Sequence, residues 1–592
     1  MTMYILKIIT LLGGLALFLF GMDIMGKSLE RLAGGRLQTI LAKMSSNVGK
    51  GFFLGLAVTA IIQSSSATTV MVVGFVNSGI MTLKQAIGVI MGSNVGTTVT
   101  AWLLSLTALE GDSLLVQIFK PATLAPLLGT IGIVLYMFTK SEKRQGVGSI
   151  FLGFMALMTG MDLMSGSMEF LEEEAWFANL MVSFSNPLLG ILVGAMLTGI
   201  IQSSSASVGI LQGLCSTGTV TFGTAIPIIL GQNIGTCVTA MISTIGANRN
   251  ARRTALVHLY FNLVGVALFV LIFYGIGAFF PWEFLQNTAG PMDIALIHTG
   301  FNLAATAVLL PMNKLLEKLA YLTIPAEPVH QKPVLLDDRL LATPAVAAQR
   351  AKEIAVQMAH TSAKAMGLAI DLTEKYDPKV MEQVLALEDE TDKYEDALGT
   401  YLVKLSGKDL TVADNHTLNT LLYTISDLER IADHAVAVAK AGQEIAEKAI
   451  VFSPAARQEL AVLQRAVTDV VGRTVSAFES RDLEQAMTVE PLEQVVDTLV
   501  KEIKSRHVRR LRDGQCTVEY GFVLEDLLTA FQRTADHCSN VAVEMLQVSE
   551  GKLEAHEYLN ALKAGQLQES AKFSERFLKF KQQYAFPESS AE

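Results

Sequence analysis

The chain has 592 residues, of which 51% are hydrophobic and 17% are charged, and its formal net charge at pH 7 is -10. This apolar content excludes an ordinary soluble domain, and an acidic chain without a basic stripe gives no sign of nucleic-acid binding. The four cysteines have no metal-ligand spacing and indicate neither a disulfide framework nor a zinc site: Cys215, Cys237, Cys516 and Cys538.

Residues 1 to about 313 form a succession of apolar segments, each near the roughly 20 residues that cross a bilayer as a helix. The first segment, MTMYILKIITLLGGLALFLFGMD, resembles a secretory signal. We expect it to be retained, because it recurs inside the chain as part of a repeat. The sequence predicts an all-α polytopic membrane protein.

An internal repeat connects the two halves of this apolar region. The shift that places Gln63 on Gln202 also aligns GSNVGTTVTA from Gly92 with GQNIGTCVTA from Gly231. One constant shift that joins separate motifs indicates a duplication. We therefore predict a first transmembrane repeat over residues 1–139 and a second, with a final helix, over residues 140–320.

Charges in the loops predict that the two repeats have opposite orientations. The loop after the first apolar segment is basic, with Lys27, Arg31, Arg36, Lys43 and Lys50. The corresponding loop of the second repeat contains Glu169, Glu172, Glu173 and Glu174 and no base. Since lysine and arginine mark cytoplasmic loops, the repeats are predicted to be inverted, as in secondary transporters with a central substrate site.

Each repeat contains a Gln-Ser-Ser-Ser motif, followed at the same spacing by Asn-x-Gly-Thr: Gln63 to Asn94, and Gln202 to Asn233. Hydroxyls and amides are costly in hydrocarbon, so we expect broken or re-entrant helices that direct these groups and free N–H groups toward a shared site. Such donors suit an oxyanion. The alternative is that the small residues only permit close helix packing, but the paired motifs favour a site.

The segments around these motifs contain almost no charge. Residues 187–248 contain no Lys, Arg, His, Asp or Glu, and residues 51–109 contain only Lys84. Burying a phosphate-like dianion without a counter-charge is unfavourable, so cations are expected to enter with it. The sequence therefore predicts cation-coupled transport of an anion.

These motifs resemble the type II sodium-dependent phosphate cotransporters over roughly residues 1–315. The resemblance implies sodium as the coupling ion and a phosphate site formed by Gln63, Ser64, Ser65, Ser66, Gln202, Ser203, Ser204 and Ser205. It also implies that sodium ligands lie near Asn94, Thr97, Thr98, Asn233 and Thr236. Cys237 replaces the equivalent of Thr98, and a thiol is a poor sodium ligand, which argues against symmetric ion sites.

Four other polar residues have two interpretations each. Asp23 and Asp162 either bind a cation or end a helix near the membrane interface. His258 and His298 either gate protons or form hydrogen bonds between helices, and we favour the second.

The remainder of the chain is charged and helical. Spaced prolines predict a linker over residues 321–343, followed by a cytoplasmic helical domain over residues 344–550 and a helical tail over residues 551–592. LERIADHA from Leu428 matches FQRTADHC from Phe531, which indicates a second duplication and two three-helix bundles.

This layout resembles PhoU, a phosphate-regulatory protein, and the resemblance implies divalent metal binding by acidic helix faces. The candidate ligands are Glu388, Asp392, Glu429, Asp433, Glu493, Asp497 and Asp536. Gln532 interrupts the last pair, and a solvated acidic face is an equally good interpretation. We expect a regulatory role, in sensing phosphate or contacting a cytoplasmic partner or a second copy.

Together these features predict sodium-coupled phosphate transport across the inner membrane by alternating access. A phosphate exporter with the same site and a membrane phosphate sensor that does not transport are the alternatives. The chain is not expected to be an enzyme, because the serine triplets lie in segments without histidine and no Gly-x-Ser-x-Gly turn is present.

Overall fold

The computed structural model describes residues 2–33, 47–106, 117–118, 120–168, 171, 174–215, 218–325, 336–550 and 570–587. Parts of the predicted linker and tail lie outside these residues, as do Arg36, Lys43, Glu169, Glu172 and Glu173 of the charged loops. The chain divides into two compact units, Met1–Val346 and Ala347–Glu592. We refer to them as the membrane unit and the C-terminal unit.

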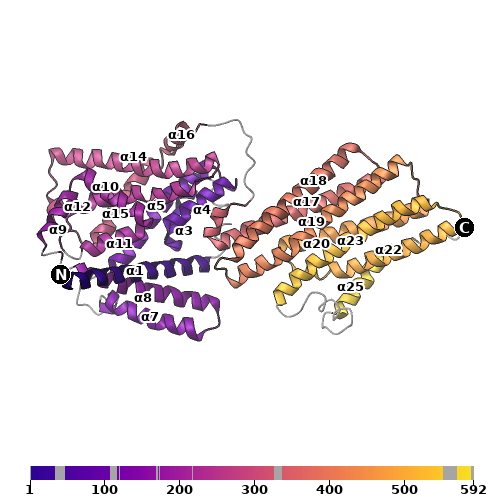
Figure 1. Cartoon of the computed structure of the whole chain (residues 1–592), viewed down its shortest axis with the longest axis horizontal. Helices are drawn as coiled ribbons and strands as arrows, with labels where there is room; N and C mark the ends of the chain where they lie inside the picture. The colour runs from indigo at the N-terminus through magenta and orange to yellow at the C-terminus, as the bar shows by residue number, and fades with distance from the viewer. Residues whose placement is uncertain are drawn as a thin grey trace. The chain divides into compact units, whose positions relative to one another are not determined.

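The membrane unit is helical throughout its described residues (Figure 1). Its helices are α1 (Thr2–Ala33), α3 (Val48–Ile62), α4 (Ser65–Asn77), α5 (Leu83–Ser105), α7 (Pro121–Phe138), α8 (Glu142–Met168), α9 (Ala175–Phe184), α10 (Pro187–Ile201), α11 (Ser204–Cys215), α12 (Phe222–Gly235), α13 (Cys237–Ser243), α14 (Arg249–Phe279), η3 (Glu283–Gln286), α15 (Pro291–Leu309), α16 (Asn313–Thr323) and η4 (Asp338–Ala342). Within the described residues, 7 helices are long and apolar enough to cross a membrane, or up to 8 if the bent pair α9–α10 is one span. The predicted all-α membrane fold is confirmed.

The sequence repeat is also a structural repeat. The shift that places Gln63 on Gln202 maps the bounds of α3 onto those of α10, and it maps the first residues of α4 and α5 onto those of α11 and α12. A buried hydroxyl pair recurs at the same shift: Thr59 bonds Thr68 at 3.1 Å, and Thr198 bonds Ser207 at 2.8 Å. Equivalent residues therefore form equivalent local structure in both repeats.

Glycines allow the paired helices of each repeat to approach at backbone distance. A Cβ atom at Gly92 would lie 1.9 Å from the carbonyl oxygen of Phe52, and one at Gly231 would lie 2.0 Å from that of Ile191. No side chain fits at either position. The small residues flanking Asn94 and Asn233 thus fix α5 against α3 and α12 against α10.

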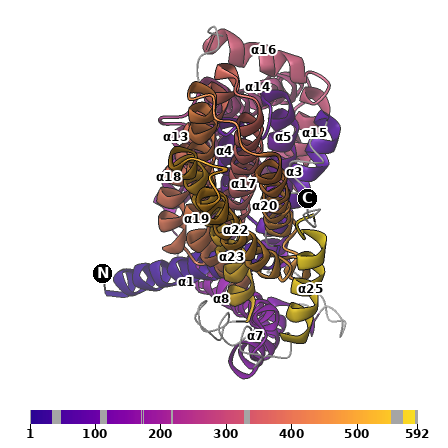
Figure 2. The same cartoon turned by 90° about the vertical axis from the view of Figure 1, so that its right-hand side faces the viewer.

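Helix α1 packs along α8, and α7 covers the other side of α8, as both views show (Figures 1 and 2). Phe18 of α1 is fully buried in this contact with Leu157 and Met161 of α8. The outward faces carry exposed apolar side chains such as Ile9 and Phe138, as expected where lipid is the solvent. The N-terminal segment is thus a structural helix of the membrane unit, paired with its repeat equivalent.

The short helix η4 packs against α4 at the end of the membrane unit. Asp337, which is 3% exposed, accepts a hydrogen bond from the Asn77 side chain of α4 at 2.6 Å. Arg339 donates to the carbonyl oxygens of Ser243 and Ile245, which belong to the second repeat. Leu340 is fully buried against Gly74. Residues 336–342 therefore contact both repeats.

The C-terminal unit is also helical, with two sets of long helices (Figure 1). They are α17 (Pro344–Glu374), α18 (Pro378–Ser406), α19 (Val412–Glu447), α20 (Pro454–Ser480), α21 (Leu483–Ala486), α22 (Val489–Arg512), α23 (Val518–Glu550) and α25 (Ser570–Gln583). Helix α20 begins with a capped proline, because Ser453 accepts a hydrogen bond from the Ala456 amide and Pro454 is the first helical residue.

Candidate functional site

Both Gln-Ser-Ser-Ser motifs break a helix at the glutamine. Gln63 and Gln202 have φ of 59° and 57°, the left-handed region that residues with a side chain rarely adopt. Their backbone N–H groups still donate to the carbonyl oxygens of Thr59 and Thr198, so α3 and α10 end at these glutamines. This conformation costs roughly 1–2 kcal/mol for a residue other than glycine, which indicates that the glutamine side chain is retained for another purpose.

The serines that follow start new helices. The Ser64 hydroxyl accepts a hydrogen bond from the Ala67 amide, and the Ser203 hydroxyl accepts one from the Ala206 amide. Helices α4 and α11 then begin at Ser65 and Ser204, whose Oγ atoms are 3.4 Å apart. Each helix N-terminus carries about half a positive charge, and two such ends meet at this point.

A cavity of about 350 Å³ lies at this meeting point. All eight residues predicted for phosphate line it, four from each repeat: Gln63, Ser64, Ser65, Ser66, Gln202, Ser203, Ser204 and Ser205. The structure therefore brings together two motifs that are far apart in the sequence. Hydroxyl donors at two converging helix N-termini form an arrangement that is suited to an oxyanion.

The cavity carries more charge than the segments around the serine motifs. Helix α1 adds Asp23, Lys27 and Glu30 to the cavity lining, and the Lys27 ammonium lies 2.8 Å from the Asp23 carboxylate. The sequence argument counted charges only in the segments around the two serine motifs, and α1 precedes both of these segments. The repeat equivalent of Asp23, Asp162, does not line the cavity, so the site is asymmetric.

The residues predicted for sodium lie elsewhere: Asn94, Thr97, Thr98, Asn233 and Thr236 are buried in or just after α5 and α12 and do not line the cavity. The three threonine hydroxyls bond carbonyl oxygens of their own helices. Asn94 Oδ1 lies 3.4 Å from Nε2 of His258, and Asn233 Oδ1 accepts a hydrogen bond from Asn302 at 3.2 Å. The contact of His258 with Asn94 agrees with the favoured interpretation of this histidine as an interhelical hydrogen-bonding residue.

This buried polar layer contains atoms without a partner among the described residues. Asn262 and Asn302 are fully buried, and their Oδ1 atoms accept no hydrogen bond; the same holds for Oε1 of Gln232. Cys237 breaks the symmetry, because its thiol bonds the His258 carbonyl oxygen and accepts from Asn262. Unsatisfied amide oxygens are costly when buried, and oxygen atoms are the ligands that hard cations prefer.

Acidic side chains cluster at two places in the C-terminal unit. Glu388, Asp392 and Asp433 can place their carboxylate oxygens within 4.8 Å of one another. Glu493, Asp497 and Asp536 form an equivalent cluster. These are six of the seven residues predicted for metal, and an all-oxygen donor set fits magnesium, calcium or manganese.

The first cluster is less neutralised than the second. Burial, Asp433 and Glu395 raise the pKa of Glu429, the seventh predicted residue, to about 7. Burial also raises the pKa of Glu388, as do Asp392 and Asp433. In the second cluster Gln532 donates to Asp497 at 2.6 Å and Arg533 lies 3.4 Å from Asp536. The first cluster has a basic neighbour as well, because Arg430 lies 3.6 Å from Asp433. The second cluster has an additional one in Lys501, 3.2 Å from Asp497, so the first cluster keeps more negative charge and is the better cation site.

We expect Asp433→Asn to weaken Mn²⁺ binding to the purified protein at least about tenfold, because it removes a carboxylate ligand. Binding by the unmodified protein should also weaken as the pH falls below about 7, since the raised pKa values of Glu429 and Glu388 mean that protons compete with the metal. Calorimetric titration at pH 6 and pH 8 measures both effects. Glu382→Gln on the exposed side of α18 is the control, and equal affinities in both variants would contradict the prediction.

Two structural repeats whose serine motifs share one cavity, within an apolar helical unit, form the architecture of a secondary membrane transporter. Residues 17–166 and 160–306 each match the family described as Na+/Pi-cotransporter, and residues 355–442 and 460–545 match the PhoU domain. The chain belongs to the Na+/Pi-cotransporter family of phosphate transporters, and its C-terminal unit carries PhoU domains.

Several known proteins are similar to the chain. The protein named "Putative inorganic phosphate export protein YjbB" of Salmonella typhimurium is 25% identical over 93% of this chain and 100% of its own length. "Uncharacterized protein YqeW" of Bacillus subtilis is 32% identical over 52% of this chain and 96% of its own. "Sodium-dependent phosphate transport protein 2A" of Rattus norvegicus is 24% identical over 45% of this chain and 60% of its own.

Among solved structures, PhoU from Pseudomonas aeruginosa covers 34% of this chain and 97% of its own, with 20% identity and a TM-score of 0.33.

Proposed function

We propose that the chain moves inorganic phosphate across the inner membrane by alternating access, coupled to sodium. The observation that carries this proposal is the convergence of the N-termini of α4 and α11, with Ser65 and Ser204 3.4 Å apart in one cavity. One helix from each repeat thus contributes to a single oxyanion site. If the repeats change their relative position, access to that site changes from one side to the other.

Sodium coupling is supported by two groups of oxygen atoms. The first is Asp23 and Glu30, whose carboxylates lie in the same cavity as the proposed phosphate site. Lys27 pairs with Asp23, so Glu30 is the acid that repels a phosphate dianion in this cavity unless a cation is bound with it. The second is the buried amide oxygens near Asn94 and Asn233, where the sequence predicted the ions. The proposal assigns sodium to these positions and phosphate to the serines.

The proposal places the C-terminal unit in the cytoplasm, as a regulator. The basic residues Lys27 and Arg31 near the end of α1, and Arg249, Arg252 and Arg253 near the start of α14, support this orientation by the positive-inside rule. The PhoU domains support a regulatory role that includes divalent metal binding at the first acidic cluster.

Export through the same cavity is the second candidate function. It is favoured by the similarity of nearly the whole chain to a protein named as a phosphate exporter. A carrier with one central site is reversible, so the ion gradients set the direction of net movement.

The test is phosphate flux into and out of proteoliposomes that contain the purified chain. We expect uptake of radiolabelled phosphate that is driven by an inward sodium gradient and absent when potassium replaces sodium. Each net positive charge that moves inward contributes about 2.3 kcal/mol per 100 mV to the driving force for uptake. The dependence of uptake on an imposed membrane potential therefore shows whether net positive charge enters with phosphate.

The two flux directions distinguish the candidates. Uptake that requires inward sodium supports the symporter, and efflux that does not respond to sodium supports export without sodium coupling. Phosphate binding without flux in either direction contradicts both and leaves a membrane sensor.

A further inference from the structure

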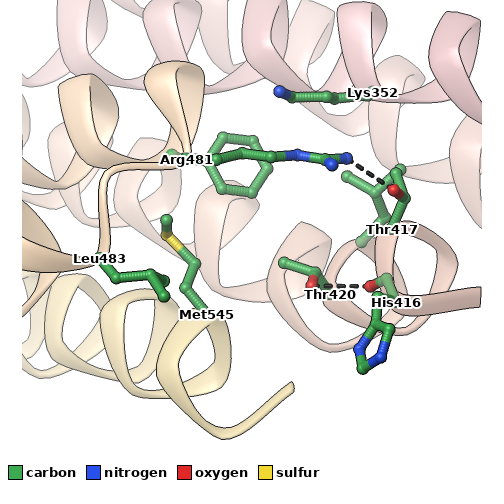
Figure 3. Close-up of a pocket in the computed structure, with 9 residues that line it drawn as sticks. Lys352, His416, Thr417, Thr420, Arg481, Leu483 and Met545 are labelled. Carbon is green, nitrogen blue, oxygen red and sulfur yellow. Dashed lines mark hydrogen bonds between the residues drawn. The ribbon is translucent and has the colours of Figure 1, made fainter. Parts of the chain in front are cut away.

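The C-terminal unit contains a half-open pocket of about 280 Å³ that none of the predicted sites includes. It lies between the start of α17, the start of α19, the end of α20 and the described end of α23 (Figure 3). Lys352, His416 and Arg481 line it together with the hydroxyls of Thr417 and Thr420. Among the described lining residues there is no aspartate or glutamate, although the chain as a whole has a net charge of -10.

Two basic side chains of this pocket, Lys352 and Arg481, have acids only in their wider surroundings, Glu479 and Asp414. Figure 3 shows the Arg481 side chain reaching toward α19, where it donates a hydrogen bond to Thr417 Oγ1 at 2.6 Å. Neither Arg481 nor Lys352 forms an ion pair with a described residue. Burial and the nearby Arg481 lower the pKa of Lys352 to about 8, while Glu479 acts in the opposite direction. An anion between the two side chains would relieve their repulsion.

The backbone supports the position of the arginine. Arg481 caps α20 with φ of 56°, a left-handed conformation in a residue with a long side chain. Glycine would adopt this conformation without strain, as it commonly does at helix ends. The strained cap directs the guanidinium across the pocket, where a planar group with several N–H donors is suited to a phosphoryl group.

The rest of the pocket is apolar. Phe478, Leu421 and Met545 are each at most 6% exposed, and Leu483 lies at the more open edge. A pocket of about 280 Å³ lies close to the lower end of the range of small-molecule sites, about 300 Å³, whereas phosphate has only five heavy atoms. The occupant therefore has an organic part as well as an anionic group, which matches the usual lining of small-molecule sites.

We propose that this pocket binds a small organic phosphate, with its phosphoryl group between Lys352 and Arg481 and its organic part against Phe478. This site is separate from the transport cavity and does not depend on the proposed transport function. The C-terminal unit would then bind two kinds of ligand, a divalent metal ion and a phosphorylated metabolite.

The test is calorimetric binding to the purified full-length chain carrying Ser65→Ala and Ser204→Ala, which weaken the transport cavity. The probes are phenyl phosphate and adenosine monophosphate, and each is compared with phenol or adenosine and with inorganic phosphate. We expect both organic phosphates to bind, and Lys352→Gln or Arg481→Asn to weaken binding roughly tenfold or more. Asparagine tolerates the left-handed conformation, so Arg481→Asn is expected to fold.

The control is Lys364→Gln, which removes an exposed lysine farther along α17. Its binding should equal that of the parent, and the thermal unfolding of each variant verifies folding. Absence of binding by both organic phosphates, or equal binding in both pocket variants and the parent, would overturn the proposal. Binding of inorganic phosphate as tight as that of phenyl phosphate would overturn the role assigned to the apolar part.

Discussion

Ser65→Ala and Ser204→Ala should each raise the phosphate concentration needed for half-maximal transport by roughly tenfold to a hundredfold. Each variant removes one hydroxyl donor to a charged ligand, which is worth about 1.5–3 kcal/mol. The two hydroxyls lie 3.4 Å apart at equivalent helix starts, so the two losses should be similar. Phosphate uptake into proteoliposomes over a range of phosphate concentrations measures them.

The matched control for these variants is Ser167→Ala. Ser167 is a buried serine of α8 whose hydroxyl bonds the Leu163 carbonyl oxygen at 2.6 Å, away from the cavity. Its replacement removes the same atom without touching the proposed site. A large effect of Ser65→Ala with none of Ser204→Ala would show that only one repeat binds phosphate, and normal kinetics in both would refute the assignment.

Gln202→Gly should separate stability from transport. Glycine adopts the left-handed conformation of this position freely, so the variant should unfold at the same or a higher temperature than the parent. Phosphate transport should nevertheless fall at least about tenfold, because the amide that lines the cavity is lost. Thermal unfolding in detergent and phosphate uptake measure the two effects on the same preparation.

Gln63 has the same backbone conformation as Gln202, but its side chain has different partners. The Gln63 side chain accepts a hydrogen bond from Thr100 at 2.8 Å and donates to the Ala60 carbonyl oxygen, whereas the Gln202 side chain makes no hydrogen bond to the described residues. Gln63→Gly should therefore lose stability as well as transport. Normal transport by Gln202→Gly would show that its amide has no role in the site.

The duplicated serine motifs predicted that their residues lie together, and the structure places them around one cavity, because two identical polar segments in apolar surroundings have few other places to lie. Their role in binding phosphate stays a prediction. The contribution of α1 could not be predicted in this way. Asp23, Lys27 and Glu30 are spaced as on any amphipathic helix end, and only the packing of α1 beside α3 and α8 places them at the cavity. The left-handed backbone conformation of Gln63 and Gln202 could not be predicted either, since glycine is the residue that usually adopts it.

In the C-terminal unit, too, the sequence predicts contacts within one helix but not contacts between helices that are far apart in the chain. The spacing of Glu388 and Asp392 predicts one helix face. The resemblance to PhoU named Asp433 among the candidate ligands, and only the packing of the bundle brings it to these two residues. The basic pocket has no such pattern, because its residues extend from Lys352 to Met545 and come from five elements. Tertiary contacts alone bring them together.

The helix η4 contacts both repeats and would therefore oppose the movement that alternating access requires. Asp337 holds the last residue of α4, and Arg339 holds the end of α13 in the other repeat. Sliding one repeat past the other at this end must break at least one of these charged hydrogen bonds, each worth about 1.5–3 kcal/mol. Residues 336–342 thus join the two repeats through side-chain hydrogen bonds whose loss opposes the relative movement that the proposed transport requires.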